Sequence, residues 1–261
     1  MHTLFVFAHQ DDEIAAAARI THALRAGSVS CVYLTDGQGR GVASRIRDEE
    51  SRVVLRRLGV DLQRVHFLGS EAQIADGHLV EHLGRALELL EARVPEQVDE
   101  VFCLAYEGGH ADHDASHLVA LAFAQRRGID CYEMPLYHGF GLPGPFFNTL
   151  APLRVGGAWT GRAIALSEGL AIASLCRLYR SQWKTWLGLM PEALLRLVFG
   201  QKEWTRRAEI ARVHEKPHAG RLFYERRFGV AWDDFARHSR AFVDSALATR
   251  ATASAQSPSR D

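Results

Sequence analysis

The chain has 261 residues, of which 47% are apolar and 24% are charged. These values are ordinary for a globular protein and allow one large α/β domain with an appendage. The 31 basic and 31 acidic residues give a formal net charge of zero. This balance disfavours a general nucleic-acid binder, because such proteins normally carry a basic excess.

Cysteine spacing and apolar runs indicate the compartment. The four cysteines are far apart and form no C-x-x-C pair: Cys31, Cys103, Cys131 and Cys176. We therefore expect neither disulfides nor a cysteine zinc site, and we expect a reducing, cytoplasmic environment. The apolar run 4–8 is too short for a signal peptide, and no run approaches the roughly 20 apolar residues of a membrane span. We expect no membrane span and no targeting segment.

Strand and helix patterns alternate through the first half of the chain. Short apolar runs predict buried strands at 3–8, 29–34, 64–68, 100–105 and about 131–135. Periodic segments with capping signals predict helices at about 13–26, 44–58, 79–93 and 113–127. The alternation predicts a Rossmann-like α/β fold, with a mostly parallel sheet and helices on both faces.

This alternation stops after about residue 138. We expect a catalytic core at 1–138, a mostly helical C-terminal extension at 139–247 that packs on the core and shapes the pocket, and a disordered tail at 248–261.

Within the extension, residues 139–157 predict a long loop, and helical patterns follow at 164–186 and 191–200. Segment 201–229 has eight Lys or Arg and four Glu. It predicts a solvated helix, with a rim for an anionic substrate as the alternative. The apolar stretch 183–199 is expected to form core or a subunit interface rather than a membrane contact.

The first chemical motif follows the first predicted strand. His9-Gln10-Asp11-Asp12-Glu13 places an imidazole and three carboxyl groups at a strand-to-helix turn, where open α/β sheets bind their ligands. Three acidic residues at a helix start can also simply complement the helix dipole. That interpretation explains the acids but not His9.

The second motif, Gly108-Gly109-His110-Ala111-Asp112-His113-Asp114, follows the fourth predicted strand. His110 and His113 can face one point, whereas His113 and His117 form a rival pair at helical spacing. We favour the former pair, because His117 lies a full turn into the helix, away from the strand ends. Asp112 can also serve as an ordinary N-cap.

Together, the two motifs predict a metal site, because both lie at strand carboxyl ends of one sheet. His9, one of the two aspartates and His113 supply two nitrogens and one oxygen. That is a typical set for catalytic zinc, which keeps a further position open. The remaining aspartate and histidine can act as general base and as acid or oxyanion stabiliser.

These motifs resemble the two signature motifs of the PIG-L (LmbE-like) zinc deacetylases. Three weaker matches accompany them: Thr35-Asp36-Gly37-Gln38-Gly39 in the second-strand turn, Arg47-Asp48-Glu49-Glu50 on a helix, and Tyr179-Arg180-Ser181-Gln182 in the C-terminal part. The resemblance covers residues 1–135 well and the rest thinly.

The resemblance implies a zinc-dependent enzyme that removes acetyl groups from small N-acetylated amino sugars or their conjugates. It implies zinc ligation by His9, Asp12 and His113. Asp11 is implied as the general base for the attacking water, and His110 as the group that stabilises the oxyanion or protonates the leaving amine.

Several residues are expected to contact the substrate. Arg47 is expected to meet a sugar hydroxyl or phosphate, although its charge-rich helix also fits simple surface pairing. Gly37 and Asp112 are further expected contacts. The loop 139–157 should border the pocket, with Phe146 and Phe147 stacking on a sugar face or aglycone.

Two positions depart from the family pattern. Gln10 stands where the family usually has proline, which should loosen the turn. Some members have a tyrosine where this chain has Gly108, and Tyr106 or Tyr137 could take its place.

Two other functions remain open at this point. One is a non-catalytic sugar-binding protein of the same fold, and the other is a metal hydrolase that acts on another bond, such as a phosphoester. The oligomeric state is also open, with a homo-oligomer as one outcome.

Overall fold

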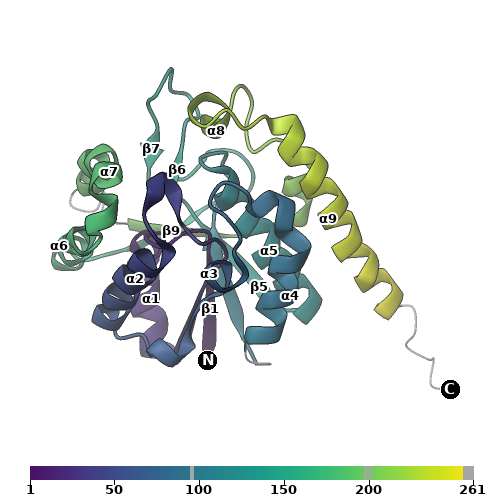
Figure 1. Ribbon diagram of the computed structural model, residues 1–261, viewed down its shortest axis with the longest axis horizontal. Helices are drawn as coiled ribbons and strands as arrows, with labels where there is room; N and C mark the ends of the chain where they lie inside the picture. Colours follow the sequence, from purple (N-terminus) through teal and green to yellow (C-terminus); the bar gives the residue numbers. More distant parts are fainter. Residues whose placement is uncertain (95–96, 197–198, 200–201, 255–261) are drawn as a thin grey trace.

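The computed structural model describes residues 1–94, 97–196, 199 and 202–254 (Figure 1). Among these residues, seven strands form one sheet in the order β3-β2-β1-β4-β5-β9-β8. Its strands are β1 (His2–Phe7), β2 (Ser28–Tyr33), β3 (Val65–Phe67), β4 (Glu100–Leu104), β5 (Asp130–Met134), β8 (Thr160–Ala163) and β9 (Lys202–Arg207). A separate short ribbon pairs β6 (Tyr137–His138) with β7 (Asn148–Thr149).

Helices cover both faces of this sheet, with α1 and α2 on one face and α4 and α5 on the other (Figure 1). The described helices are α1 (Glu13–Ala26), α2 (Ser44–Leu58), α3 (Leu68–Ala72), α4 (Leu83–Arg93), α5 (Ala111–Arg127), α6 (Leu166–Leu175), α7 (Trp183–Leu195), α8 (Phe223–Arg227) and α9 (Trp232–Ser254). The predicted Rossmann-like fold class is therefore confirmed.

The alternating side chains of β1 show how the core is divided. Leu4 and Val6 pack in the cluster on the α4 and α5 side, whereas Phe5 and Phe7 pack in the cluster on the α1 side. A strand buried on both faces needs a continuous apolar run. This is why the sequence predicted β1 to β5 to within about two residues.

The position of β1 between β2 and β4 creates the functional crevice. β1 pairs in parallel with both neighbours, and the strand order reverses direction at this point. In open α/β sheets, ligands bind at the carboxyl ends of the strands beside such a switch point. The turns after β1 and β4 therefore lie side by side.

The prediction of a solvated helix over 201–229 is wrong where β9 forms. β9 pairs antiparallel with β5 and β8, so the extension lengthens the sheet. The cause is a buried ion pair: Arg206 on β9 donates from Nε to Glu133 on β5, and both side chains are 3% exposed. Arg206 lies 73 residues after Glu133. The pairing of β9 with β5 could therefore not be predicted from the sequence around either strand.

The single helix predicted at 164–186 is also wrong. α6 ends at Leu175, and two 3₁₀ turns (Cys176–Leu178 and Arg180–Gln182) precede α7. Between these turns, Tyr179 has φ −87° and ψ 74°, which is not helical. The chain leaves the helix here because the Tyr179 side chain turns into the core, where it is 1% exposed.

The other predicted segments of the C-terminal half are partly different. The loop 139–157 contains β7, and α7 continues through Pro191 to Leu195, so no separate helix begins at Pro191. α9 runs to Ser254 and so includes the start of the predicted disordered tail. Residues 255–261 of that tail lie outside the described residues.

We expect Arg206→Met to lower the free energy of unfolding by about 3–5 kcal/mol, because it leaves the Glu133 carboxylate buried without its cation. The adjacent Arg207→Met is the control. Its side chain is 70% exposed and pairs with Asp130 at the surface, so its loss should cost less than about 1 kcal/mol. Urea unfolding of both variants measures the difference; equal small losses would contradict the prediction.

Candidate active site

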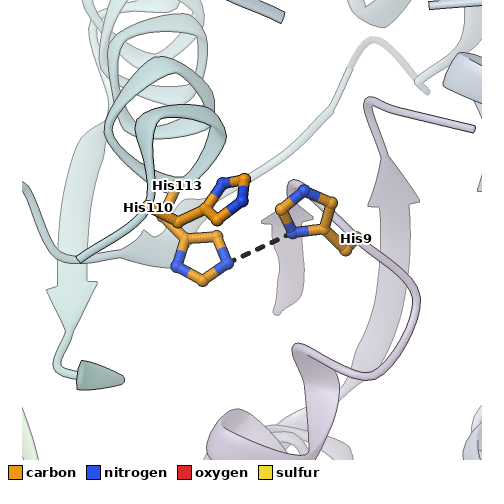
Figure 2. Close-up of side chains that lie close together, drawn as sticks. All are labelled: His9, His110 and His113. Carbon is orange, nitrogen blue, oxygen red and sulfur yellow. Dashed lines mark hydrogen bonds between the residues drawn. The ribbon is translucent and has the colours of Figure 1, made fainter. Parts of the chain in front are cut away.

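The turns after β1 and β4 enclose a cavity of about 180 Å³. Its polar side carries most of the residues that the sequence singled out: His9, Asp11, Asp12, Arg47, His110 and His113. Figure 2 shows the imidazoles of His9, His110 and His113 close together, although they come from segments far apart in the sequence. His9 lies in the turn after β1, and His110 and His113 lie at the start of α5. The other wall is mainly apolar and includes Leu136, Tyr137, Trp186, Leu189 and Phe228.

Three side chains in this cavity have nitrogen or oxygen atoms spaced like the ligands of one metal ion. His9 Nδ1 lies 3.2 Å from His113 Nε2, and His113 Nε2 lies 3.2 Å from Asp12 Oδ1. His9 Nδ1 is 3.8 Å from Asp12 Oδ2. Ligand atoms at 2.0–2.1 Å from a tetrahedral zinc ion lie about 3.3 Å apart. The two nitrogens and the carboxylate therefore fit a zinc-like cation.

Asp112 holds His9 from behind. Its Oδ2 lies 3.1 Å from His9 Nε2, and its two oxygens accept the backbone N–H groups of Gly77 and Leu79. A carboxylate on the outer nitrogen of a histidine keeps the inner nitrogen free for a metal. Asp112 is completely buried and does not line the cavity. Its contact with substrate stays a prediction, and the structure gives it the role of holding His9.

Asp76 is a site residue that sequence reasoning missed. It lines the cavity, and its Oδ1 lies 3.2 Å from His9 Nε2. His9, Asp76 and Asp112 form a second group of possible metal ligands. Asp76 reaches the site because Asp112 binds the backbone of the next residue, Gly77. No local pattern in the sequence distinguishes it from other loop acids.

The two adjacent aspartates have different surroundings. Burial raises the pKa of Asp11 to about 7, although the Arg47 guanidinium opposes that shift. Burial also acts to raise the pKa of Asp12, but His113 and His9 hold it down at about 2. Asp12 thus faces the imidazoles, whereas Asp11 lies 3.1 Å from Arg47 at the cavity edge.

Arg47 is buried, so the alternative of a solvated surface residue is wrong. Its guanidinium donates to the carbonyls of Gln10 and Gly37 and to Asp11. Gly37 does not line the cavity. Its φ is 58°, and a Cβ there would lie 2.0 Å from Gln10 Oε1. Gly37 therefore has a structural role, in which it lets Arg47 and Gln10 approach, and its contact with substrate stays a prediction.

The absence of the family proline suggested that Gln10 loosens the turn, but in the structure Gln10 is held firmly. Its amide donates to Asp48 on α2 over 2.6 Å, and its carbonyl accepts from Arg47. The next residue, Asp11, has φ 110°, which is rare for a residue other than glycine. These bonds hold the Asp11 backbone in a strained conformation.

His110 is arranged as a neutral donor. Its Nδ1 accepts the backbone N–H of Asp112, so the proton of the neutral ring is on Nε2. Burial and the neighbouring His9 lower the pKa of His110 to about 4. The rival residue His117 instead bonds the carbonyl of Leu104 and lies in the core beside Glu133. It does not line the cavity.

At Gly108 this chain lacks the tyrosine of some family members. Of the two candidate replacements, Tyr137 lies at the cavity and Tyr106 does not. The Tyr137 ring lies 5.3 Å from that of His113 and lines the cavity. Tyr106 instead donates to the carbonyl of Glu215. Gly108 has φ 73°, and a Cβ there would lie 2.7 Å from a Leu222 methyl, so a tyrosine does not fit at this position.

The predicted substrate contact of Phe146 stays a prediction, although this structure places the ring away from the cavity. This side chain is 64% exposed and does not line the cavity. Phe147 packs against Tyr137 and Phe223 behind the cavity wall. Aromatic rings at the cavity come instead from Tyr137 in β6, Trp186 in α7 and Phe228 directly after α8. Because the sequence does not show how these segments fold back, they could not be assigned in advance.

Residues 4–124 match the family model described as GlcNAc-PI de-N-acetylase, or PIG-L. Residues 4–124 are a PIG-L family domain. Both histidine motifs of the candidate site lie inside this PIG-L domain. None of the curated proteins compared with the chain matches it.

Solved structures share the fold along most of the chain, well beyond the PIG-L domain. The teicoplanin-biosynthesis deacetylase in its bog complex has 16% identity and a TM-score of 0.57, covering 80% of this chain and 99% of its own. The N,N'-diacetylchitobiose deacetylase from Pyrococcus horikoshii, with its inhibitor MPG, has 18% identity and a TM-score of 0.56, covering 84% and 87%. A conserved protein from Thermus thermophilus has 19% identity and a TM-score of 0.54, covering 77% and 92%.

In the described part of the chain, every helix is too short or too polar to cross a bilayer.

The extension is joined to the PIG-L domain beneath the site. The Tyr179 hydroxyl donates to Glu13 and lies 2.7 Å from Ser51 Oγ. The other oxygen of Glu13 accepts the backbone N–H of Asp11. Burial raises the pKa of Glu13 to about 7. This buried chain of hydrogen bonds supports the strained turn that carries Asp11.

We expect Tyr179→Phe to lower the free energy of unfolding by about 1–3 kcal/mol, because Glu13 and Ser51 lose a buried partner. Tyr132→Phe is the matched control. The Tyr132 hydroxyl makes a 3.3 Å bond to Asp130 at a half-buried position, so its loss should cost less than about 1 kcal/mol. Thermal or urea denaturation measures the stability of both variants. Equal losses of stability for the two variants would contradict a supporting role for the Tyr179 hydroxyl.

Proposed function

We propose that this chain is a zinc-dependent hydrolase that removes the acetyl group from an N-acetylated amino sugar or its conjugate. The observation that carries the proposal is the convergence of His9 Nδ1, Asp12 and His113 Nε2 at ligand spacing. Asp11 and His110 line the same cavity. The deacetylases among the solved structures of the same fold, one of which acts on N,N'-diacetylchitobiose, support the reaction class.

His9, Asp12 and His113 would hold the metal. When bound there, zinc supplies Lewis acidity and makes water a better nucleophile at neutral pH. One structure of the same fold is described as the zinc-inhibited form of teicoplanin deacetylase, at 16% identity. Zinc therefore interacts with that protein, although there it inhibits.

The other polar residues of the cavity supply the proton transfers. Asp11 takes a proton from the attacking water, and its bond to Arg47 fixes the direction of its carboxylate. His110 carries its proton on Nε2 and uses it to donate a hydrogen bond to the amide oxygen as negative charge develops there. The leaving amine needs one proton, which Asp11 has acquired from the water. The second proton of the water stays with the carboxyl product, so the atoms balance as acetic acid and a free amine.

The geometry favours amide hydrolysis over phosphoester hydrolysis. Arg47 is the one lysine or arginine among the described residues that line the cavity. Its Nη atoms are already bonded to two backbone carbonyls and Asp11. A phosphate group would therefore meet carboxylates without a free cation of the protein. The apolar wall with Trp186 and Phe228 suits the ring face of a sugar or an aglycone.

We expect the purified protein to bind one divalent metal ion per chain and to lose its activity with a chelator. Activity should return with up to one equivalent of zinc, and the titration should include excess zinc and other divalent cations. The substrates should be N-acetylglucosamine conjugates and N,N'-diacetylchitobiose, with phosphoesters assayed in parallel. Metal-independent activity, or hydrolysis of phosphoesters alone, would overturn the proposal. Sugar binding without hydrolysis would identify a non-catalytic protein.

We expect Asp11 and Asp12 to respond differently to substitution. Asp12→Ala should lose the metal and with it the activity. Asp11→Asn should retain the metal but lower kcat by roughly 10²–10⁴-fold with little change in KM, because a general base acts in the transition state. Asp244→Asn, at an exposed position on α9, is the control and should change neither. Metal content and kinetics test all three, and metal loss in Asp11→Asn with retention in Asp12→Ala would reverse the roles.

A further inference from the structure

Two helices of the C-terminal extension, α6 and α7, present apolar side chains to solvent. We call these residues the α6–α7 surface: Leu166, Leu170, Trp183, Leu187, Leu194 and Leu195. Trp183 is 56% exposed and Leu187 is 66% exposed. A groove of about 770 Å³ runs along this surface. An exposed apolar patch of this kind, rimmed by polar residues, marks an interaction site.

The sequence predicted core or a subunit interface at residues 183–199. Core is wrong for these exposed side chains, whereas the subunit interface stays a prediction. α7 does have an inner face, which lines the catalytic cavity with Gln182, Thr185, Trp186 and Leu189. Trp186 lines both that cavity and the outer groove. The α6–α7 surface therefore begins directly beside the catalytic cavity. In Figure 1, both helices lie at the side of the molecule opposite α9.

The charges around the α6–α7 surface have one sign. Arg177, Arg180 and Lys184 are exposed, and none of them makes a salt bridge within the described part of the chain. The nearby acids already have partners: Glu168 pairs with Arg162, Glu192 pairs with Arg196, and Glu50 accepts hydrogen bonds from the backbone N–H and hydroxyl of Ser181. Lys184 Nζ also lies 5.5 Å from the centre of the Trp183 ring. The apolar patch is thus surrounded by unpaired cations.

We propose that the α6–α7 surface docks on an anionic lipid bilayer. Leucine and tryptophan side chains on one helix face enter the boundary between headgroups and acyl chains, while arginine and lysine bind lipid phosphates. Tryptophan is enriched at this depth because its ring is apolar and its N–H is polar. Docking in this way holds the mouth of the catalytic cavity at the bilayer surface.

A second copy of the chain fits this surface less well. In a two-fold symmetric dimer, the same patch meets itself. Arg177, Arg180 and Lys184 would then lie near the same three cations of the other copy. The acids beside the patch, Glu50, Glu168 and Glu192, already have partners within the chain. An anionic bilayer instead offers both an apolar layer and negative charge, which matches both features of the surface.

The test is co-sedimentation of the full chain with vesicles of phosphatidylcholine and phosphatidylglycerol in equal parts, compared with vesicles of phosphatidylcholine alone. We expect binding to the anionic vesicles and at least tenfold weaker binding to the neutral ones. Higher salt should weaken binding further, because it screens the cations. This assay needs no substrate, so its result is independent of the proposed deacetylase activity.

Two variants locate the contact. Trp183→Ser with Leu187→Ser removes apolar contact, and Arg177→Glu with Arg180→Glu and Lys184→Glu reverses the charge. Each should lower the vesicle affinity at least tenfold, since one surface cation alone contributes about fivefold. Matched controls are Phe146→Ser, an exposed aromatic on another loop, and Arg85→Glu with Arg240→Glu on α4 and α9. These controls should bind nearly as the unaltered chain does.

Circular dichroism of each variant establishes that it is folded, so that loss of binding reflects the surface. Failure of the unaltered chain to sediment with anionic vesicles would overturn the proposal. Equal binding by the unaltered chain and both α6–α7 variants would also overturn it. A dimer in sedimentation velocity that Leu187→Ser dissociates would assign the surface to a second copy instead.

Discussion

The crowding of carboxylates around one imidazole is the constraint on which the site depends. Asp12, Asp76 and Asp112 each have an oxygen within 3.8 Å of a ring nitrogen of His9. Buried carboxylates at such spacing repel one another unless cations lie among them. The imidazoles, Arg47 and a bound metal ion can each supply positive charge there. The proposed divalent cation would reduce this repulsion, and its binding would then be coupled to the stability of the folded chain.

Much of the fold and of the site could be predicted because the signals are local. β1 is a continuous apolar run, and His9 follows it directly, so strand and site come from one stretch of sequence. His110 and His113 follow β4 in the same way. The crossover rules of parallel sheets then bring both turns to one edge.

The remaining features depend on partners far away in the sequence. Tyr179 interrupts a helical pattern because its hydroxyl bonds Glu13, 166 residues earlier. β9 forms where Arg206 meets Glu133, 73 residues earlier. Asp76 reaches the cavity through a loop that Asp112 holds. Local periodicity contains no information on such contacts. The same contacts make the C-terminal extension part of the core sheet and of the support beneath the site.

The backbone at Asp11 has a consequence for how the chain can change. A φ of 110° suits glycine far better than aspartate, and non-glycine residues in such regions cost on the order of 1–3 kcal/mol. Selection for thermal stability alone would thus favour glycine at position 11, whereas selection for the proposed proton transfer would retain the carboxylate. Loss of the selected activity would leave a more stable domain. A homologue with glycine at this position would be recognisable from that one residue. It would be a relative that has lost the proposed proton transfer and gained stability.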